Sequence, residues 1–222
     1  MLEALRQNSL YDETALFFFS DHGDFTGDYG LVEKTQNTFE DCLVRVPFVV
    51  KPPAWVKTQP RSCDAMVELI DMHATVEALL DIPPSHTHFG RSLLPLIAGE
   101  AVQHRQAVFC EGGRLHGEIH CMELESDIDT HPGDLYLPRL YWQRRTGPEH
   151  TKAVMVRTRD FKYVRRLYET SELYDLRSDP QELRNRINDP SLAEELRELK
   201  ERLITFFLET GDVVPFDIDR RY

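Results

Sequence analysis

The stretch Leu16-Phe-Phe-Phe-Ser-Asp-His-Gly23 sets the expectation for the fold. Its apolar half is a short unbroken run, which is typical of a strand buried on both faces in the middle of a parallel sheet. Open α/β sheets bind their ligands just beyond the carboxyl ends of such strands, and Asp21 and His22 stand at that point. Carboxylates and imidazoles are ligands for divalent cations. The stretch therefore predicts a buried strand followed by half of a metal site.

Three glycines and a lysine follow this pair. Gly23, Gly27 and Gly30 would let the backbone bend closely around a bound group. Lys34 lies twelve residues after His22, where its ammonium could meet an anionic substrate oxygen beside the metal. Taken alone, the Asp-His pair would fit equally well as a strand-end cap beside a surface histidine.

The composition bounds the class of protein. The 222 residues suffice for one large domain or a domain and a half with a sizeable core. With 26 basic and 38 acidic residues the net charge is −12, which argues against a nucleic-acid partner. Residues 139–166 carry nine basic and two acidic residues, a charge of +7, so the remainder carries −19. This segment is either a patch for an anionic substrate or, as we favour, a solvated sheet face that balances acidic neighbours.

The cysteines and the apolar runs say little about the compartment. Cys42, Cys63, Cys110 and Cys121 form no C-x-x-C pair, which favours four free thiols over a disulfide framework. No run approaches the ~18 apolar residues of a membrane span, so no membrane partner is expected. No signal peptide is visible, and residues 1–6 look like the inside of a helix, as if the chain began within a fold. Localisation, cytoplasmic or periplasmic, stays open.

Alternating strands and helices predict an α/β sheet in the first part of the chain. The expected elements are a helix over 35–43, a strand over 46–51 ended by Pro52-Pro53, a strand over 65–70, and a helix over 72–80. Asp71 is placed to cap that last helix. A loop with His86 and His88 follows.

The second part of the chain has a different pattern. Short strands over 108–111, 153–157, 161–167 and 172–175, with a long irregular stretch over 112–150, indicate an antiparallel meander. A final helix over 191–210 is indicated by Asp189-Pro190 at its start and Gly211 at its end. Its apolar stripe comprises Leu192, Leu196, Leu199, Leu203 and Phe206. The stripe is expected to pack on the small sheet, with a partner-binding helix as the alternative.

The stretch Thr14 to Lys34, followed by Arg45-Val-Pro-Phe-Val-Val50, resembles the sulfatase family of the alkaline-phosphatase-like superfamily. The resemblance continues through Gly90-Arg-Ser-Leu-Leu-Pro95 and through Glu172-Leu-Tyr-Asp-Leu-Arg-Ser-Asp-Pro-Gln-Glu-Leu-Arg-Asn185. It implies the C-terminal portion of the family's α/β sheet with its helices over residues 1–105. Over residues 106–222 it implies a small antiparallel α+β subdomain.

The resemblance also implies an activity, the hydrolysis of aryl or carbohydrate sulfate esters. In the family, the Asp and the residue after it ligate a divalent cation, most often Ca²⁺, with Mn²⁺ or Mg²⁺ as alternatives. This role falls to Asp21 and His22. The lysine of the following G-x-x-x-K-like stretch contacts the sulfate, and here it is Lys34. An Asp-His pair is also similar to the phosphonate and phosphodiester monoesterases of the superfamily, which are the rival activity.

The family's nucleophile is a formylglycine made from the Cys or Ser of a C/S-x-P/A-x-R motif upstream of the metal pair. The twenty residues before Asp21 hold no such motif. We therefore expect a C-terminal part whose formylglycine-bearing N-terminal half is missing, and an isolated chain that is inactive. The exposed sheet edge would favour that half, or a second copy of the chain, as partner. Cys110-Glu-Gly-Gly-Arg114 imitates the motif but has glycine at the Pro/Ala position, and we interpret it as a decoy.

Two further interpretations stay open. A zinc site could draw on His116, His120, Cys110 and Cys121, but the glycines among them favour a loop near the substrate pocket. His86 and His88 are likewise expected to be loop residues that could face the substrate. A non-catalytic module that holds sulfated glycans through Arg165 and Arg166 is the alternative function.

Overall fold

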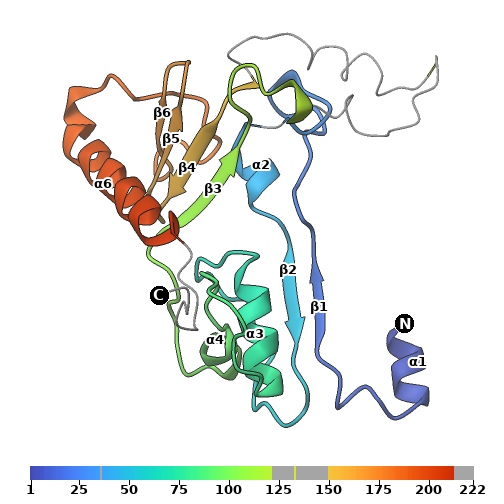
Figure 1. The fold of residues 1–222 in the computed structure, drawn as a ribbon. Helices are drawn as coiled ribbons and strands as arrows, with labels where there is room; N and C mark the ends of the chain where they lie inside the picture. The colour runs from blue at the N-terminus through green and yellow to red at the C-terminus, as the bar shows by residue number, and fades with distance from the viewer. Residues whose placement is uncertain (36, 122–132, 134–149, 213–222) are drawn as a thin grey trace, which may run out of the picture. The chain divides into compact units, whose positions relative to one another are not determined.

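The computed structural model describes residues 1–35, 37–121, 133 and 150–212. It divides into two compact units (Figure 1). Unit 1 comprises residues 1–23, 45–108 and 201–222, and unit 2 comprises residues 24–44 and 109–200. Each unit is thus built from segments that are distant in sequence. The chain passes from unit 1 to unit 2 directly after Gly23, the residue that follows the Asp-His pair.

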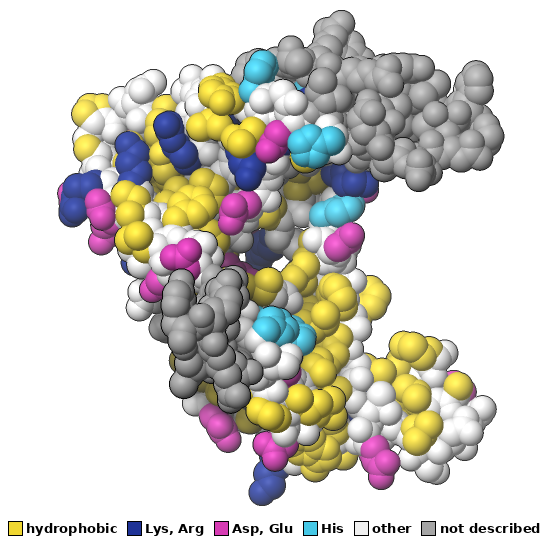
Figure 2. Space-filling model, in the orientation of Figure 1, with side chains coloured by type: hydrophobic (Ala, Val, Ile, Leu, Met, Phe, Trp, Pro, Cys, Tyr) yellow, Lys and Arg dark blue, Asp and Glu magenta, His cyan; other side chains and the backbone are white. Residues whose placement is uncertain are grey.

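Unit 1 contains a two-stranded antiparallel ribbon. β1 (Leu16–Phe19) pairs with β2 (Phe48–Lys51) in a register that sets Phe19 opposite Phe48. Phe18 is 69% exposed and Val49 is 59% exposed, and Figure 2 shows hydrophobic side chains along this ribbon. The expectation that the first strand is buried on both faces of a parallel sheet is therefore wrong for this structure. The neighbour of β1 among the described residues runs antiparallel and covers neither face.

Helices form the rest of unit 1. The helical pattern at the start of the chain is α1 (Leu2–Gln7), and the helix expected over 72–80 is α3 (Asp71–Leu80). Helix α4 (Leu94–Ala98) contacts α3, and the contact buries Leu93 and Leu96. No helix of the described residues combines the length and the apolar character that a membrane crossing requires.

Two expectations for unit 1 are corrected by the structure. Residues 65–70 form no strand and contribute only an isolated bridge between Met66 and Arg105. Asp71 does not cap α3, because it is the first helical residue and its side chain points into the unit. Its fully buried carboxylate accepts hydrogen bonds from Nε of Arg105 at 3.0 Å and from the backbone N–H of Glu68 at 2.9 Å. A buried ion pair determines its position.

Unit 2 is built on a four-stranded sheet. In spatial order its strands are β3 (Val108–Gly112), β4 (Ala153–Arg157), β5 (Phe161–Arg166) and β6 (Glu172–Asp175). β5 pairs antiparallel with both β4 and β6. The predicted meander is confirmed for these three strands, and β3 lies where the first short strand was expected. Most of the predicted irregular stretch over 112–150 lies outside the described residues, except for the short turn η2 (Ile119–Cys121).

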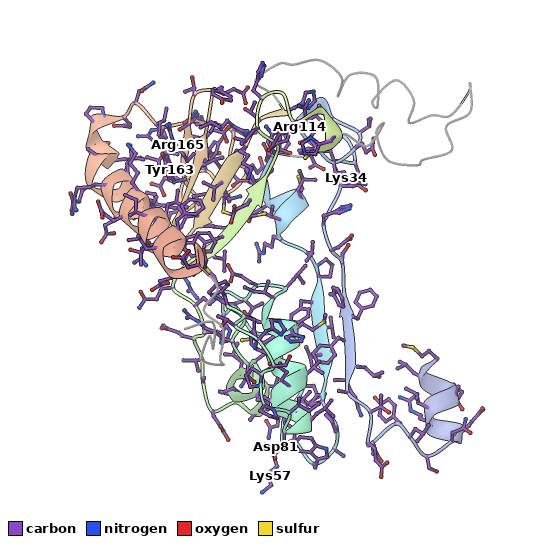
Figure 3. The ribbon with its side chains drawn as sticks, viewed as in Figure 1. Lys34, Lys57, Asp81, Arg114, Tyr163 and Arg165 are labelled. Atoms are coloured by element: carbon purple, nitrogen blue, oxygen red, sulfur yellow. The ribbon has the colours of Figure 1, made fainter. Side chains whose placement is uncertain are left out.

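Each face of this sheet is covered. On one face, Met155 and Val164 form a buried cluster with Phe39 and Ala153. On the other, Tyr163 is 2% exposed and lies 6.0 Å below the ammonium of Lys200 (Figure 3). Because side chains alternate along a strand, β5 supplies residues to both layers.

The helix expected over residues 35–43 is largely absent. Only α2 (Asp41–Val44) is helical. Residues 37–40 are not helical, and hydrogen bonds hold Asn37 and Phe39 to unit 2. Nδ2 of Asn37 donates to the carbonyl of Thr151 at 2.9 Å, and Nζ of Lys162 donates to the carbonyl of Phe39 at 2.8 Å. Tertiary hydrogen bonds thus replace those of the predicted helix.

The final helix, α6 (Ala193–Thr210), follows the short turn η5 (Pro190–Leu192). The carboxylate of Asp189 caps that turn by accepting from the backbone N–H of Ser191 at 2.8 Å. The apolar stripe is confirmed, since all five of its members are buried or half-buried. Helix and cap lie within two residues of the prediction.

Candidate functional site

Asp21 and His22 follow directly on β1, and local hydrogen bonds fix their backbone. The hydroxyl of Ser20 donates to the carbonyl of His22 at 2.6 Å, and the backbone N–H of His22 donates to Oδ1 of Asp21 at 3.0 Å. Nδ1 of His22 lies 2.8 Å from the carbonyl of Gly23. Because a carbonyl only accepts, Nδ1 carries the proton and Nε2 presents its lone pair. Metal-ligating histidines are oriented in the same way, by a hydrogen bond from the second ring nitrogen.

The pair fits a divalent cation. Nε2 of His22 lies 3.8 Å from Oδ2 of Asp21. Bonds from metals to nitrogen or oxygen are about 2.0–2.6 Å long, so one ion can contact both atoms. The two side chains are 42% and 83% exposed, which leaves such an ion open to a substrate. Among the described residues, no group of three His, Cys, Asp or Glu side chains includes either residue. The described chain thus offers two ligands here.

The loop after Gly23 belongs to unit 2 and is anchored there by aromatic side chains. Phe25 is fully buried and contacts the ring of Tyr29 edge-on, with centroids 5.9 Å apart. The hydroxyl of Tyr29 donates to the carbonyl of Gln181 at 2.7 Å. Burial, together with the charge of nearby Glu182, raises the pKa of Tyr29 to about 12. The phenol therefore stays protonated and remains a hydrogen-bond donor.

The glycines of this loop differ in their role. Gly27 and Gly30 have φ of 113° and 75°, in the left-handed region that favours glycine, whereas Gly23 does not lie there. Lys34 closes the loop, because its backbone N–H donates to Oδ1 of Asp24 at 2.9 Å. Its side chain is half-buried (Figure 3). Lys34 belongs to unit 2, whereas the Asp-His pair belongs to unit 1.

The sequence was compared with known proteins. Residues 1–82 match the family model described as Sulfatase. Over 201 residues the chain is 27% identical to "Uncharacterized sulfatase YidJ" of Escherichia coli (strain K12), with 90% of this chain and 33% of that protein covered. Both matches show that the chain is similar to sulfatases. The chain spans about a third of the length of this relative.

Solved structures of similar fold agree with a mixed α/β architecture. One is a protein in complex with its substrate D-glucosamine-2-N,6-O-disulfate, at a TM-score of 0.71 and 20% identity, covering 100% of this chain and 39% of that one. Another is the phosphonate monoester hydrolase of Agrobacterium radiobacter, at a TM-score of 0.71 and 21% identity, covering 98% and 42%. At these identities the likeness establishes the fold.

The second sulfatase-like motif, residues 90–95, has a structural role. A Cβ on Gly90 would lie 2.3 Å from the carbonyl oxygen of Ile70, so the two backbones meet too closely for any side chain. The next backbone N–H groups donate to α3: that of Arg91 to Oδ1 of Asp71 at 2.8 Å, and that of Leu93 to Oγ1 of Thr75 at 2.9 Å. The motif fastens the segment before α4 onto α3.

The third motif, residues 172–185, holds a buried carboxylate. Glu182 is 5% exposed, adopts a φ of 58°, and accepts from the backbone N–H of Asp41 at 2.9 Å. It also forms an ion pair with Lys162. Burial raises the pKa of Glu182 despite this partner. Burial acts in the same direction on Asp41, but Lys162 and Arg157 outweigh it and lower the pKa of that carboxyl.

These ion pairs bear on the basic segment 139–166. Three of its charged side chains on β4 and β5 pair with acids: Arg157 and Lys162 with Asp41, and Arg166 with Glu172. Lys162 is 1% exposed and Arg166 is 8% exposed, whereas Arg165 is exposed. The structure thus supports the balance with acidic neighbours, but the expectation of a solvated face is wrong for Lys162 and Arg166. Arg139, Arg144 and Arg145 lie outside the described residues.

The described residues support neither a zinc site nor a nucleophile at the cysteines. All four cysteines are free thiols, as expected. Cys110 lies on β3 and packs against the cluster around Phe39, which agrees with the decoy interpretation. Cys110, His116, His120 and Cys121 do not meet as a metal cluster within the described parts of the chain. The residues that do meet are His73, Glu77 and His88. The i, i+4 spacing of the first two on a predicted helix was the signal for them in the sequence.

Proposed function

We propose that this chain is the C-terminal, metal- and sulfate-binding part of a sulfatase that hydrolyses sulfate esters. The observation that carries the proposal is the orientation of His22. Its Nδ1 is tied to the carbonyl of Gly23, and its Nε2 lies 3.8 Å from Oδ2 of Asp21. This arrangement follows β1 inside the segment that matches the Sulfatase family model.

The side chains have separate roles in this proposal. Asp21 and His22 would hold a divalent cation, Ca²⁺ by the family resemblance, with Mn²⁺ or Mg²⁺ as alternatives. Such an ion, when bound, polarises an oxygen of the substrate. Lys34 would hold another sulfate oxygen and neutralise the charge that develops on it. The backbone bond between Lys34 and Asp24 fixes the point from which the lysine side chain leaves the loop.

The substrate class is proposed from one of the structural relatives. A protein of similar fold is described in complex with D-glucosamine-2-N,6-O-disulfate as its substrate. We therefore propose a sulfated carbohydrate, with an aryl sulfate as the simpler analogue. The phosphonate monoester hydrolase of equal TM-score supports a second candidate, the hydrolysis of phosphonate or phosphate esters.

The nucleophile would lie outside these residues. The 222 residues contain no C/S-x-P/A-x-R motif, and Cys110-Glu-Gly-Gly-Arg114 has its cysteine in a packed strand. In the proposed enzyme the formylglycine belongs to a part that this chain does not supply. The 222-residue chain is therefore expected to bind a sulfate ester without hydrolysing it.

Calorimetric titration of the chain with D-glucosamine-2-N,6-O-disulfate, with and without Ca²⁺, tests the proposal. We expect Ca²⁺ to strengthen binding, and Asp21→Asn and His22→Ala to abolish that strengthening. Lys34→Ala should weaken sugar binding about tenfold or more, since hydrogen bonds to charged groups contribute about 1.5–3 kcal/mol. Lys57→Ala is the matched control, because Lys57 is an exposed lysine of unit 1 (Figure 3).

Four outcomes would contradict the proposal in different ways. Equal binding by the parent and all three site variants would show that Asp21, His22 and Lys34 do not form the binding site. Tighter binding of a phosphonate monoester than of the sulfate ester would favour the second candidate. Loss of heparin binding in Arg165→Ala, with Asp21→Asn unaffected, would favour the non-catalytic glycan-binding module. Metal-dependent release of p-nitrophenol from p-nitrophenyl sulfate by the chain would show that the nucleophile had been wrongly placed.

A further inference from the structure

Three ionisable side chains of unit 1 converge beside α3. His73 and Glu77 are four residues apart on this helix and so lie on the same face. His88 reaches them from the loop that follows the helix. Nε2 of His73 lies 3.2 Å from Oε1 of Glu77, and Nε2 of His88 lies 2.8 Å from Oε2 of the same carboxylate. One ligand atom from each residue lies within 4.8 Å of the other two.

The surroundings of this cluster suit a bound ion. An open cavity of about 400 Å³ is lined by Ile70, His73, His86, Thr87, His88, Phe89 and Gly90. The ring of His86 lies 5.8 Å from that of His73 and 5.9 Å from that of His88. Glu77 is 13% exposed and His88 is 20% exposed, whereas His73 is 57% exposed. The site therefore has two partly buried ligands and one at the surface through which an ion can enter.

His88 has a ring nitrogen that no other group uses. Its Nδ1 is buried and has no hydrogen-bond partner among the described residues. Buried polar atoms are usually satisfied, and an exception calls for an explanation. Nε2 faces Glu77 at 2.8 Å and is the ring nitrogen that His88 can offer to an ion, whereas Nδ1 gives up no hydrogen bond when an ion binds.

We propose that His73, Glu77 and His88 bind a borderline divalent cation, with Zn²⁺ as the best fit. Two imidazoles and one carboxylate are a common protein ligand set for zinc and leave a fourth position open. With metal–ligand bonds of about 2.0–2.1 Å, tetrahedral ligand atoms lie about 3.3 Å apart. The separations of 3.2 Å and 2.8 Å, which end on the two different oxygens of Glu77, are near that value, and one ligand atom from each of the three residues lies within 4.8 Å of the other two. Imidazole ligands also favour zinc over calcium or magnesium.

The bound ion would fasten the loop of His86 and His88 to α3. That loop ends at Gly90, whose backbone meets the carbonyl of Ile70. The bound ion would thus stabilise the fold of unit 1 next to the second sulfatase-like motif. It shares no residue with the Asp-His pair, which we assign to a different class of cation. The inference therefore does not depend on the proposed function.

Competition for Zn²⁺ between the 222-residue chain and a chromogenic chelator tests this site. We expect the parent to bind one Zn²⁺. The affinity for Zn²⁺ should fall at least about tenfold in His73→Ala, Glu77→Gln and His88→Ala, since even the loss of a residue that only hydrogen-bonds a metal ligand lowers metal affinity 10–100-fold. His116→Ala is the control and should bind as the parent does, because His116 is an exposed histidine of unit 2 outside the cluster.

A second measurement guards against variants that fail to fold. His73 is the most exposed ligand, so His73→Ala is expected to leave the apo fold intact, and its thermal midpoint without metal should match that of the parent. Saturating Zn²⁺ should then raise the midpoint of the parent and not that of His73→Ala. The proposal is overturned if His73→Ala and Glu77→Gln keep the parent's affinity, if the parent binds no Zn²⁺, or if His116→Ala abolishes binding.

Discussion

Lys162 and Glu182 form an ion pair in which each side chain is only 1% exposed. The ammonium of Lys162 also donates to Oδ1 of Asp41 at 2.7 Å and to the carbonyl of Phe39 at 2.8 Å. Withdrawing charges from water costs free energy, which is recovered only where the partners are complete. The cluster therefore ties together β5, the segment before α2 and the turn after β6. It is sensitive to the loss of any one member.

Replacing Lys162 by methionine should lower the free energy of unfolding by about 3–5 kcal/mol, because buried Glu182 loses its counter-charge and Asp41 keeps only Arg157. Urea unfolding monitored by hydrogen exchange at β5 measures the effect within unit 2. Lys152→Met is the control, since Lys152 is an exposed lysine beside β4 and its replacement should change stability by less than about 0.5 kcal/mol. Similar values for the two variants would show that the cluster contributes no specific stability.

Asp71 makes the stability of unit 1 depend on pH in the acid range. Burial alone would raise the pKa of this carboxyl, but hydrogen bonds from Arg105 and from the backbone N–H groups of Glu68 and Arg91 outweigh it and lower the pKa. A lowered pKa in the folded state means that the stabilisation is complete above the unfolded value, about 3.9, and is lost as the pH falls below it. The stability difference between the parent and Asp71→Asn should therefore narrow between pH 6 and pH 3, by chemical denaturation at each pH.

The control for this pH series is Asp81→Asn. Asp81 is exposed at the end of α3, in a left-handed conformation that asparagine also tolerates (Figure 3). Its replacement should leave the pH profile of unit 1 unchanged. A constant difference between the parent and Asp71→Asn across this range would mean that Asp71 keeps an ordinary pKa in the folded state.

Gly90→Ala should destabilise unit 1 by about 1–3 kcal/mol, as overpacking does. The added methyl would lie 2.3 Å from the carbonyl oxygen of Ile70, which is backbone and cannot rotate away. Gly117→Ala is an instructive comparison, because Gly117 has open space around it but a φ of 86°. That variant tests backbone strain without a clash. Thermal unfolding by circular dichroism compares the two, and an unchanged midpoint for Gly90→Ala would contradict the close approach.

The apolar ribbon of β1 and β2 should drive association of the isolated chain. Phe18 and Val49 are paired across the ribbon and are both largely exposed. Exposed apolar patches and unpaired strand edges favour contact between copies. The double variant Phe18→Ser with Val49→Thr should shift the chain toward the monomer in sedimentation velocity. Leu208→Ser, at a single exposed leucine of α6, is the control. Equal association of the parent and the double variant would exclude the ribbon as the contact.

Elements set by local patterns were predictable from the sequence. The stripe of α6, the Asp189 cap and the three meander strands rest on periodicity and turn residues, which are visible in a short window. The segment before α2 was mispredicted as a helix because Asn37 is bound to Thr151, just before β4, and Phe39 to Lys162 of β5, both far away in the sequence. Asp71 was mispredicted as a cap because its partner, Arg105, is far away in sequence. Long-range ion pairs leave no periodic trace.

The candidate site was likewise predictable only in part. Asp21 and His22 were recognisable as a motif, and the hydrogen bond from Nδ1 of His22 adds the orientation that the sequence could not supply. The cluster of His73, Glu77 and His88 needed the loop to return to α3, which no local pattern specifies. The spacing of His73 and Glu77 along the predicted helix could have indicated two of its members, but they were not identified from the sequence.

The discontinuous make-up of unit 2 sets the order in which it can form. Asn37 and Thr151, which are hydrogen-bonded in the fold, are 114 positions apart, and Lys162 and Phe39 are 123 apart. Contacts of such separation slow folding because the intervening chain must be closed first. During synthesis, residues 24–44 leave the ribosome long before the strands that cover them exist. This segment therefore waits without its partners, and folding of unit 2 is limited by the arrival of β4 and β5.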